Sequence, residues 1–139
     1  MTNVIAIALA AILSVESSGG KNLKDGDGGR AVGPFQMWTV AVREVNRIYK
    51  TDYKYEDRRN FAKSARMCEL TLQYHYKRGT TNVIDLACKW RNPFSPTPAW
   101  YRTKIKKAVK EYERTQKNQQ AVAGVPSRIH NSRADPPVP

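Results

Sequence analysis

Cysteine and histidine are scarce in this chain, and their scarcity limits the function classes open to it. Two cysteines, Cys68 and Cys88, occur in 139 residues, too few for a disulfide-dense scaffold or a four-cysteine metal site. The two histidines, His75 and His130, show no ligand spacing with each other or with a cysteine. We therefore expect no metal and no cofactor. The cysteines are interpreted as buried free thiols, although a bridge between the two predicted helices that carry them is geometrically allowed.

Long apolar runs and acidic residues are lacking as well. The N-terminal apolar run, residues 4–15, is shorter than the roughly 20 residues of a membrane-spanning helix. Only Met1, Thr2 and Asn3 precede it, so it lacks the basic segment of a signal peptide. We interpret it as a buried helix of the mature protein. Lys and Arg number 24 against 12 Asp and Glu, a formal net charge of +12, which predicts attraction to a polyanion such as nucleic acid, an anionic membrane or the bacterial envelope.

Alternation of apolar and polar residues over strand length is missing, whereas helical spacing recurs along the chain. We predict helices over residues 2–17, 39–49, 58–78 and 82–90, and a last helix that opens at Thr97-Pro98. The glycines of residues 21–33 predict a loop, and its length is compatible with a short β-hairpin within residues 21–36. The predicted fold class is therefore mainly α.

The composition divides the chain into one folded domain and a tail. Residues 1–114 are enough to bury one hydrophobic core. From Thr115 the sequence shifts to Gln, Asn, Ala, Ser and Pro, a composition typical of segments that do not pack. We therefore predict a basic, proline-containing flexible tail or linker over residues 115–139.

Glu16 is the first carboxylate of the chain and stands where the first predicted helix ends, directly before Ser17-Ser18-Gly19-Gly20. Carbonyl dipoles converge at a helix C-terminus, and the residues before Glu16 are apolar. Both features disfavour a charged carboxylate and raise its pKa. A carboxylic acid held neutral near working pH can donate a proton to a leaving oxygen. Glu16 is therefore the candidate general acid.

The loop that follows, Asp25-Gly-Asp-Gly-Gly-Arg30, carries further carboxylates. Acidic residues two apart in a glycine-rich turn begin an EF-hand loop. Counted from Asp25, however, the fifth, sixth and twelfth positions are Gly29, Arg30 and Gln36, which are not the residues of a calcium loop. We interpret the segment as a flexible loop that presents Asp27 or Asp25 near Glu16.

Two motifs, in their order and spacing, resemble a known family. Ile12-Leu-Ser-Val-Glu-Ser-Ser-Gly19, the glycine-rich loop and Ala31-Val-Gly-Pro-Phe-Gln-Met37 are similar to the Glu-Ser and Gly-x-x-Gln motifs of soluble lytic transglycosylases and goose-type lysozymes, in the lysozyme-like superfamily. This part of the resemblance covers roughly the first 50 residues.

A third, looser match follows. Leu86-Ala-Cys-Lys-Trp-Arg-Asn-Pro93 and the following Tyr101-Arg-x-Lys-Ile105 are similar to the family's Ala-Tyr-Asn-x-Gly region, but the Asn is displaced and the Gly is missing. The resemblance implies a lysozyme-like helical domain that cleaves the β-1,4 bond between N-acetylmuramic acid and N-acetylglucosamine in peptidoglycan. The implied substrate-binding residues are Ser17, Gly33, Gln36, Trp90, Asn92 and Tyr101.

Several of these residues have an expected role. Gly33 would let the backbone approach the saccharide closely, and the Gln36 amide would hydrogen-bond to a sugar or to Glu16. Trp90 and Tyr101 would stack on sugar rings.

The second carboxylate decides the reaction type. An inverting hydrolase needs a base across the bond from Glu16, for which Asp27 is the candidate, with Asp25 behind it. A lytic transglycosylase instead closes a 1,6-anhydro ring and needs no second carboxylate.

We expect a monomer that acts on peptidoglycan glycan strands at the anionic bacterial envelope. Without a recognisable signal peptide, a phage-encoded or virion-associated enzyme is the favoured origin, and a secretion-system transglycosylase is its competitor. The basic helix around Lys104, Lys106, Lys107 and Lys110 would be attracted to the envelope.

Two other functions remain open. One is a basic nucleic-acid-binding module, although the chain has no recognised nucleic-acid fingerprint. The other is an inactive envelope-binding virion subunit.

Overall fold

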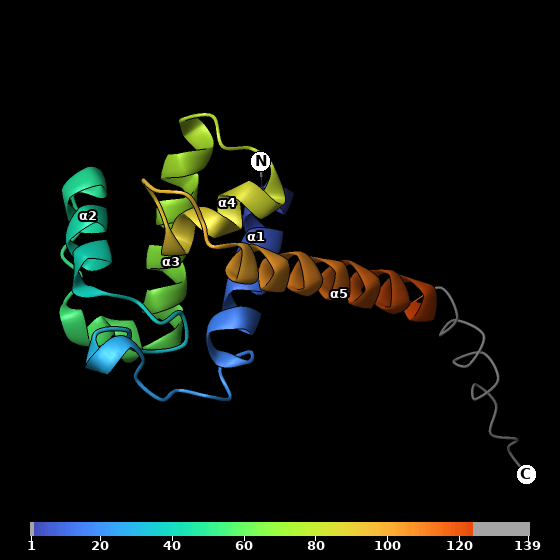
Figure 1. Cartoon of the computed structure of the whole chain (residues 1–139), viewed down its shortest axis with the longest axis horizontal. Coiled ribbons are helices and arrows are strands. Elements are labelled where there is room, and N and C mark those ends of the chain that lie inside the picture. The colour runs from blue at the N-terminus through green and yellow to red at the C-terminus, as the bar shows by residue number, and fades with distance from the viewer. Residues whose placement is uncertain (1, 124–139) are drawn as a thin grey trace, which may run out of the picture.

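The computed structural model describes residues 2–123 and is mainly helical (Figure 1). The helices are α1 (Thr2–Ser17), α2 (Thr39–Tyr49), α3 (Phe61–Lys77), α4 (Val83–Arg91) and α5 (Ala99–Ala123), with two short 3₁₀ turns, η1 (Asp27–Gly29) and η2 (Tyr55–Arg59). The predicted mainly-α fold class is confirmed.

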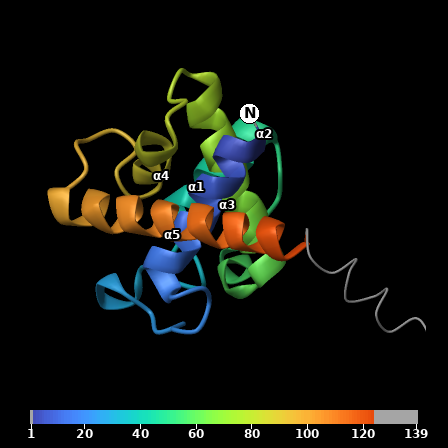
Figure 2. The same cartoon turned by 90° about the vertical axis from the view of Figure 1, so that its right-hand side faces the viewer.

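Helix α1 forms the centre of the packing and contacts α3, α4 and α5 (Figures 1 and 2). Its buried face carries Ile5, Ala8, Ala11 and Ile12. The small alanines allow neighbouring helices to approach closely, and the apolar side chains join the main core. The central position of α1 explains why its sequence is apolar. The last two residues of α1, Glu16 and Ser17, lie at the edge of the core. None of the helices in residues 2–123 combines the length and the apolar character needed to cross a membrane.

A smaller second core joins α2 to α3. Met37, Val42 and Val45 pack there against Met67 and Leu70 of α3. Helix α2 contacts α3 and η2, whereas α1, α4 and α5 pack against one another. The indole of Trp90 lies against both cores. Because α2 reaches the rest of the molecule mainly through α3, space remains between α2 and the end of α4.

The helix boundaries agree with the sequence-based predictions to within a few residues. The helix predicted from residue 58 begins at Phe61 because Asn60 caps it. The Asn60 Oδ1 accepts a hydrogen bond from the Lys63 N–H at 2.9 Å. The preceding residues form η2 instead. Cys68 and Cys88 are both free and buried, and burial raises the pKa of both thiols.

The predicted start of the flexible tail is wrong. Helix α5 continues through Ala123, so residues 115–123 are helical. Gln, Lys and Ala are good helix formers, and neither Gly nor Pro interrupts the chain before Gly124. The remainder of the predicted tail, with His130, lies outside the described residues.

The loop between α1 and α2 contains two tight turns rather than the short hairpin considered for residues 21–36. Isolated antiparallel bridges pair Gly26 with Ala31 and Val32 with Met37. Gly33 is buried in the second turn with φ 81°. A Cβ added there would lie 1.9 Å from the Arg58 carbonyl oxygen. Gly33 is therefore required where the loop packs on the η2 backbone.

This packing predicts that Gly33→Ala destabilises the fold. Both the left-handed backbone and the collision with the Arg58 carbonyl oppose a Cβ, and we expect a loss of about 3 kcal/mol in the free energy of unfolding. Gly28→Ala is the matched control because Gly28 has φ 67° but no atom within 4 Å of its added Cβ. That variant should lose only about 1 kcal/mol. Urea denaturation measures both, and equal losses would contradict the packing argument.

Candidate active site

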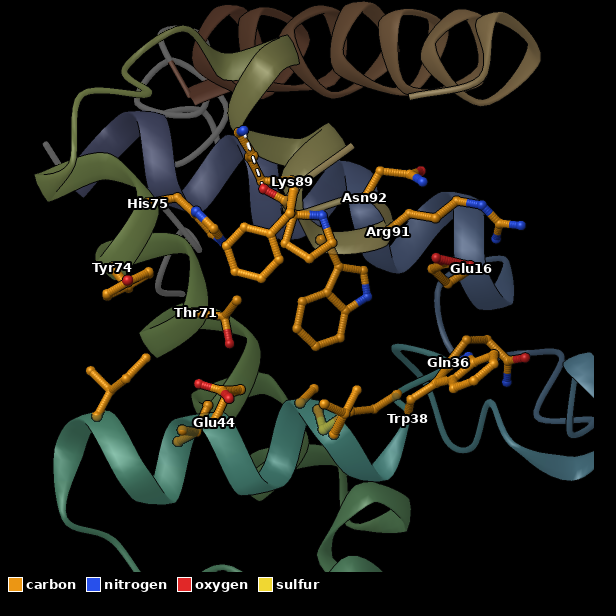
Figure 3. A pocket seen from close by; sticks show the side chains of 18 of the residues that line it. Glu16, Gln36, Trp38, Glu44, Thr71, Tyr74, His75, Lys89, Arg91 and Asn92 are labelled. Atoms are coloured by element: carbon orange, nitrogen blue, oxygen red, sulfur yellow. Dashed lines mark hydrogen bonds between the residues drawn. The ribbon is translucent and has the colours of Figure 1, made fainter. Parts of the chain in front are cut away.

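A cleft of about 530 Å³ opens where α2 stands apart from α4. The end of α1, the loop before α2, faces of α2 and α3, and the C-terminal end of α4 line it. Figure 3 shows Glu16, Gln36 and Trp38 at one end of the cleft and Tyr74 and His75 at the other. The cleft is therefore elongated, with Glu16 at one end.

Glu16 is partly buried one residue before the end of α1. Burial raises the pKa of its carboxyl group to about 7, and the charge of Asp27 acts in the same direction. A hydrogen bond from Tyr101 and the positive charges of Arg91 and Lys104 lower that pKa and only partly offset the burial. The raised pKa predicted for Glu16 is confirmed, with burial as its largest cause. Near neutral pH the group can both hold and release a proton.

Tyr101 holds the Glu16 carboxyl group through a hydrogen bond. Its hydroxyl donates a hydrogen bond to Glu16 Oε2 at 3.0 Å. The ring is buried in the main core and does not line the cleft, so the predicted stacking of Tyr101 on a sugar is wrong. Burial raises the pKa of the Tyr101 hydroxyl, which therefore remains a donor. Tyr101 is a positioning residue for Glu16.

Only one of the two loop aspartates shares the cleft with Glu16. Asp27 lines the cleft, and its Oδ2 accepts a hydrogen bond from Trp38 Nε1 at 3.2 Å. It also adopts a left-handed backbone with φ 50°, a conformation that Asp tolerates better than most residues. Asp25 lies outside the cleft. Its two carboxylate oxygens accept hydrogen bonds from Arg59 at 3.1 and 3.0 Å, which lower its pKa.

Gln36 lines the cleft, but its amide nitrogen forms hydrogen bonds within the loop between α1 and α2. Its Nε2 donates to the carbonyl oxygens of Lys24 at 3.2 Å and Gly33 at 3.1 Å. Gly26 leaves room for the amide, since a Cβ there would lie 2.6 Å from Gln36 Oε1. The expected hydrogen bond to Glu16 is not formed. Gln36 instead fixes the loop that carries Asp27.

Ser17 and Gly33 do not line the cleft, so the predicted substrate contacts of both residues are wrong. The buried Ser17 Oγ donates to the Leu13 carbonyl oxygen at 3.3 Å and accepts from the Gly20 N–H at 2.9 Å. These bonds close the C-terminus of α1 directly after Glu16. Gly33 packs on the Arg58 backbone. Both residues therefore stabilise the backbone that carries the cleft residues: Ser17 that of α1, and Gly33 that of the following loop.

Trp90 and Asn92 both line the cleft, and the substrate contacts expected of them stay predictions. Trp90 Nε1 donates to the Phe35 carbonyl oxygen at 2.9 Å, which fixes the indole as part of the wall. Asn92 Nδ2 donates to Ser95 Oγ at 3.4 Å, whereas Asn92 Oδ1 is buried with no hydrogen-bond partner among the described residues. A buried acceptor without a partner is unfavourable.

The far end of the cleft was not predicted from the sequence. It contains Tyr74, His75 and Phe94, with the His75 ring centroid 5.3 Å from that of Tyr74 and 6.4 Å from that of Phe94. His75 is buried, and burial lowers its pKa. No local motif marks this group, because it forms only when α3 and the segment after α4 come together.

Within residues 2–123, no group of three or more His, Cys, Asp or Glu side chains is placed to hold a metal ion. Comparison of the chain with protein-family models, curated proteins and solved structures gives no match. The functional argument therefore depends on the residues of the cleft.

The raised pKa of Glu16 predicts a pH-dependent stability difference for Glu16→Gln. A folded-state pKa of about 7, above the ordinary 4.5, means that Glu16 favours folding at low pH and that this contribution is lost as pH rises through 7. Glutamine cannot ionise and keeps an acceptor for Tyr101. We therefore expect Glu16→Gln to be more stable than the parent by about 2 kcal/mol near pH 9, and closely similar to it near pH 4.

Urea denaturation at the two pH values measures this difference. Glu113→Gln, at an exposed position of α5, is the matched control for the loss of a carboxylate, and the effect of Glu16→Gln is measured relative to it. An equal effect of Glu16→Gln at both pH values would contradict the raised pKa.

Proposed function

We propose that this protein is a peptidoglycan-cleaving glycosidase that cuts the β-1,4 bond between N-acetylmuramic acid and N-acetylglucosamine, with Glu16 as general acid. One observation carries the proposal: a carboxyl group with a pKa of about 7 lies at the end of an elongated cleft. The Glu-Ser and Gly-x-x-Gln motifs, which resemble those of lytic transglycosylases and goose-type lysozymes, connect this geometry to a glycan substrate.

The hydrogen bond from Tyr101 assigns different roles to the two oxygens of Glu16. Oε2 accepts a hydrogen bond from the Tyr101 hydroxyl, so in the neutral acid the carboxyl proton belongs on Oε1. Oε1 then donates to the glycosidic oxygen as the bond breaks and the sugar becomes oxocarbenium-like. Below pH 7 most of the enzyme carries this proton, because the pKa of Glu16 is about 7.

The cleft wall supports carbohydrate binding. Apolar and aromatic side chains with a few fixed polar groups are typical of ligand sites. Here the indoles of Trp38 and Trp90 contribute aromatic surface, and the side chains of Gln36 and Asn92 add polar groups to the lining.

The second half of the reaction depends on Asp27. Its position on the same cleft, with the carboxylate fixed by Trp38, supports hydrolysis in which Asp27 activates water. If the muramoyl 6-hydroxyl attacks instead, a 1,6-anhydro ring closes and Glu16 works alone. We propose the bacterial envelope as the place of action, reached by phage or virion delivery. A net charge of +12 favours approach to its anionic polymers.

The proposal predicts that Glu16→Gln keeps the fold and loses about 10²–10⁴-fold in peptidoglycan cleavage, the usual contribution of a general acid. Turbidity of cell-wall suspensions and mass spectrometry of the released fragments measure this loss, and Glu113→Gln is the control that should remain active. A fully lytic Glu16→Gln would overturn the assignment.

The same mass spectra distinguish the two reactions. Fragments with a reducing muramic acid, together with loss of activity in Asp27→Asn, indicate hydrolysis with Asp27 as base. Fragments one water lighter, with activity retained in Asp27→Asn, indicate ring closure with Glu16 alone.

A further inference from the structure

Two cations and an exposed tryptophan gather beside Glu16, at the end of the cleft where Glu16 lies: Arg91 lines the cleft, whereas Trp100 and Lys104 do not. Arg91 is the last residue of α4, and Trp100 and Lys104 lie at the start of α5. The Trp100 ring centroid is 5.0 Å from the Arg91 guanidinium carbon and 5.4 Å from Lys104 Nζ. One ring therefore holds both cations through cation–π contacts. We refer to Arg91, Trp100 and Lys104 as the cationic cluster.

The cationic cluster lies next to the reacting group. Tyr101, the residue after Trp100, donates its hydrogen bond to Glu16, and Figure 3 shows the Arg91 side chain passing beside Glu16. In the described part of the chain, no residue of α5 lines the cleft. The cluster therefore begins in the cleft at Arg91 and continues the surface beyond it through Trp100 and Lys104.

The two positive charges lack a fixed counterion. Among the described residues, neither Arg91 nor Lys104 takes part in an ion pair. The carboxyl group on which both charges act is Glu16, and Glu16 is neutral in the form that donates a proton. In that form the cluster presents two positive charges, held together by one ring, with no negative partner.

We propose that Arg91, Trp100 and Lys104 form a subsite that binds a carboxylate of the substrate, on the side of Glu16 away from the Tyr74 and His75 end of the cleft. This inference rests on the proposed function. An enzyme that cuts within a polymer binds it on both sides of the broken bond, and the cleft extends to one side of Glu16. The guanidinium of Arg91 can bind a carboxylate through two parallel hydrogen bonds, and Lys104 adds a second charge.

Peptidoglycan offers carboxylates from two sources. In peptide-free strands, the lactyl group of muramic acid is itself a free carboxylate attached to the sugar. In peptide-bearing strands, that group is amide-bonded, and the free carboxylates belong to the stem peptide. Both sources offer the same carboxylate group to the subsite. Comparing peptide-free with peptide-bearing strands therefore shows which source is bound.

Binding at the cationic cluster would also act on the general acid. Arg91 and Lys104 lower the pKa of Glu16, and a carboxylate bound between them would offset their charges. Glu16 would then keep its proton to higher pH in the complex than in the free enzyme. The subsite thus couples substrate binding to protonation of the acid.

The test uses Glu16→Gln as a protein that binds without cutting. Its affinity is measured by fluorescence anisotropy for labelled soluble strands, peptide-free and peptide-bearing, each with free carboxylates and after chemical amidation of those carboxylates. We expect Arg91→Gln with Lys104→Gln, added to Glu16→Gln, to weaken binding of at least one free-carboxylate strand about tenfold. Binding of the corresponding amidated strand should not change.

Lys106→Gln with Lys110→Gln is the matched control, because it removes the same charge from other exposed positions of α5. The control should weaken binding by much less. A loss confined to peptide-free strands identifies the lactyl carboxylate, and a loss confined to peptide-bearing strands identifies the stem peptide.

Two outcomes refute the subsite. Only the second of them also refutes the proposed function. If Glu16→Gln binds the strands but the cluster variant behaves like the lysine control, or loses free and amidated strands equally, the subsite is refuted and the proposed function stands. If Glu16→Gln binds no strand and the parent protein cleaves none, both are refuted.

Discussion

The hydrogen bond from Tyr101 to Glu16 joins the first helix to the last at the edge of the main core. The partial burial that comes with this contact raises the pKa of the Glu16 carboxyl group to about 7. The bond itself opposes part of that rise and fixes which oxygen accepts. A free carboxyl group on a surface helix would have neither property. The chemistry proposed for the cleft therefore depends on how α1 and α5 pack.

The rest of the architecture supplies the surroundings of that carboxyl group. Helix α2 is attached mainly through α3, which leaves the cleft open between α2 and the end of α4. The loop between α1 and α2 is held by Gln36 and by the close packing of Gly33 on Arg58. As a result Asp27 lies on the cleft while Asp25 is bound to Arg59 outside it. Gly33 thus helps to position the Asp27 carboxylate, because its missing Cβ leaves room for the Arg58 carbonyl oxygen.

Local sequence patterns predicted the helices and the place of Glu16 at the end of the first one. Neighbouring residues are enough for this, because they encode both the apolar helix and the glycines that end it. The roles of Gly33 and Tyr101 could not be predicted in this way. The atom that Gly33 avoids belongs to Arg58, and the partner of the Tyr101 hydroxyl lies 85 positions away along the chain. Ser17 was assigned to the substrate because it adjoins Glu16, yet its hydroxyl closes α1. The far wall at His75 and Phe94 likewise exists only after folding.

The central claim is that this fold raises the pKa of Glu16 to about 7, so that a large share of the molecules carry a neutral acid at neutral pH. The most direct measurement is a pH titration of the Glu16 side-chain carboxyl carbon by NMR, assigned by comparison with Glu16→Gln. The account predicts a midpoint of about 7, well above the ordinary value of 4.5. A midpoint near 4.5 would contradict it, because Glu16 would then be an ordinary solvated carboxylate with no proton to donate at neutral pH.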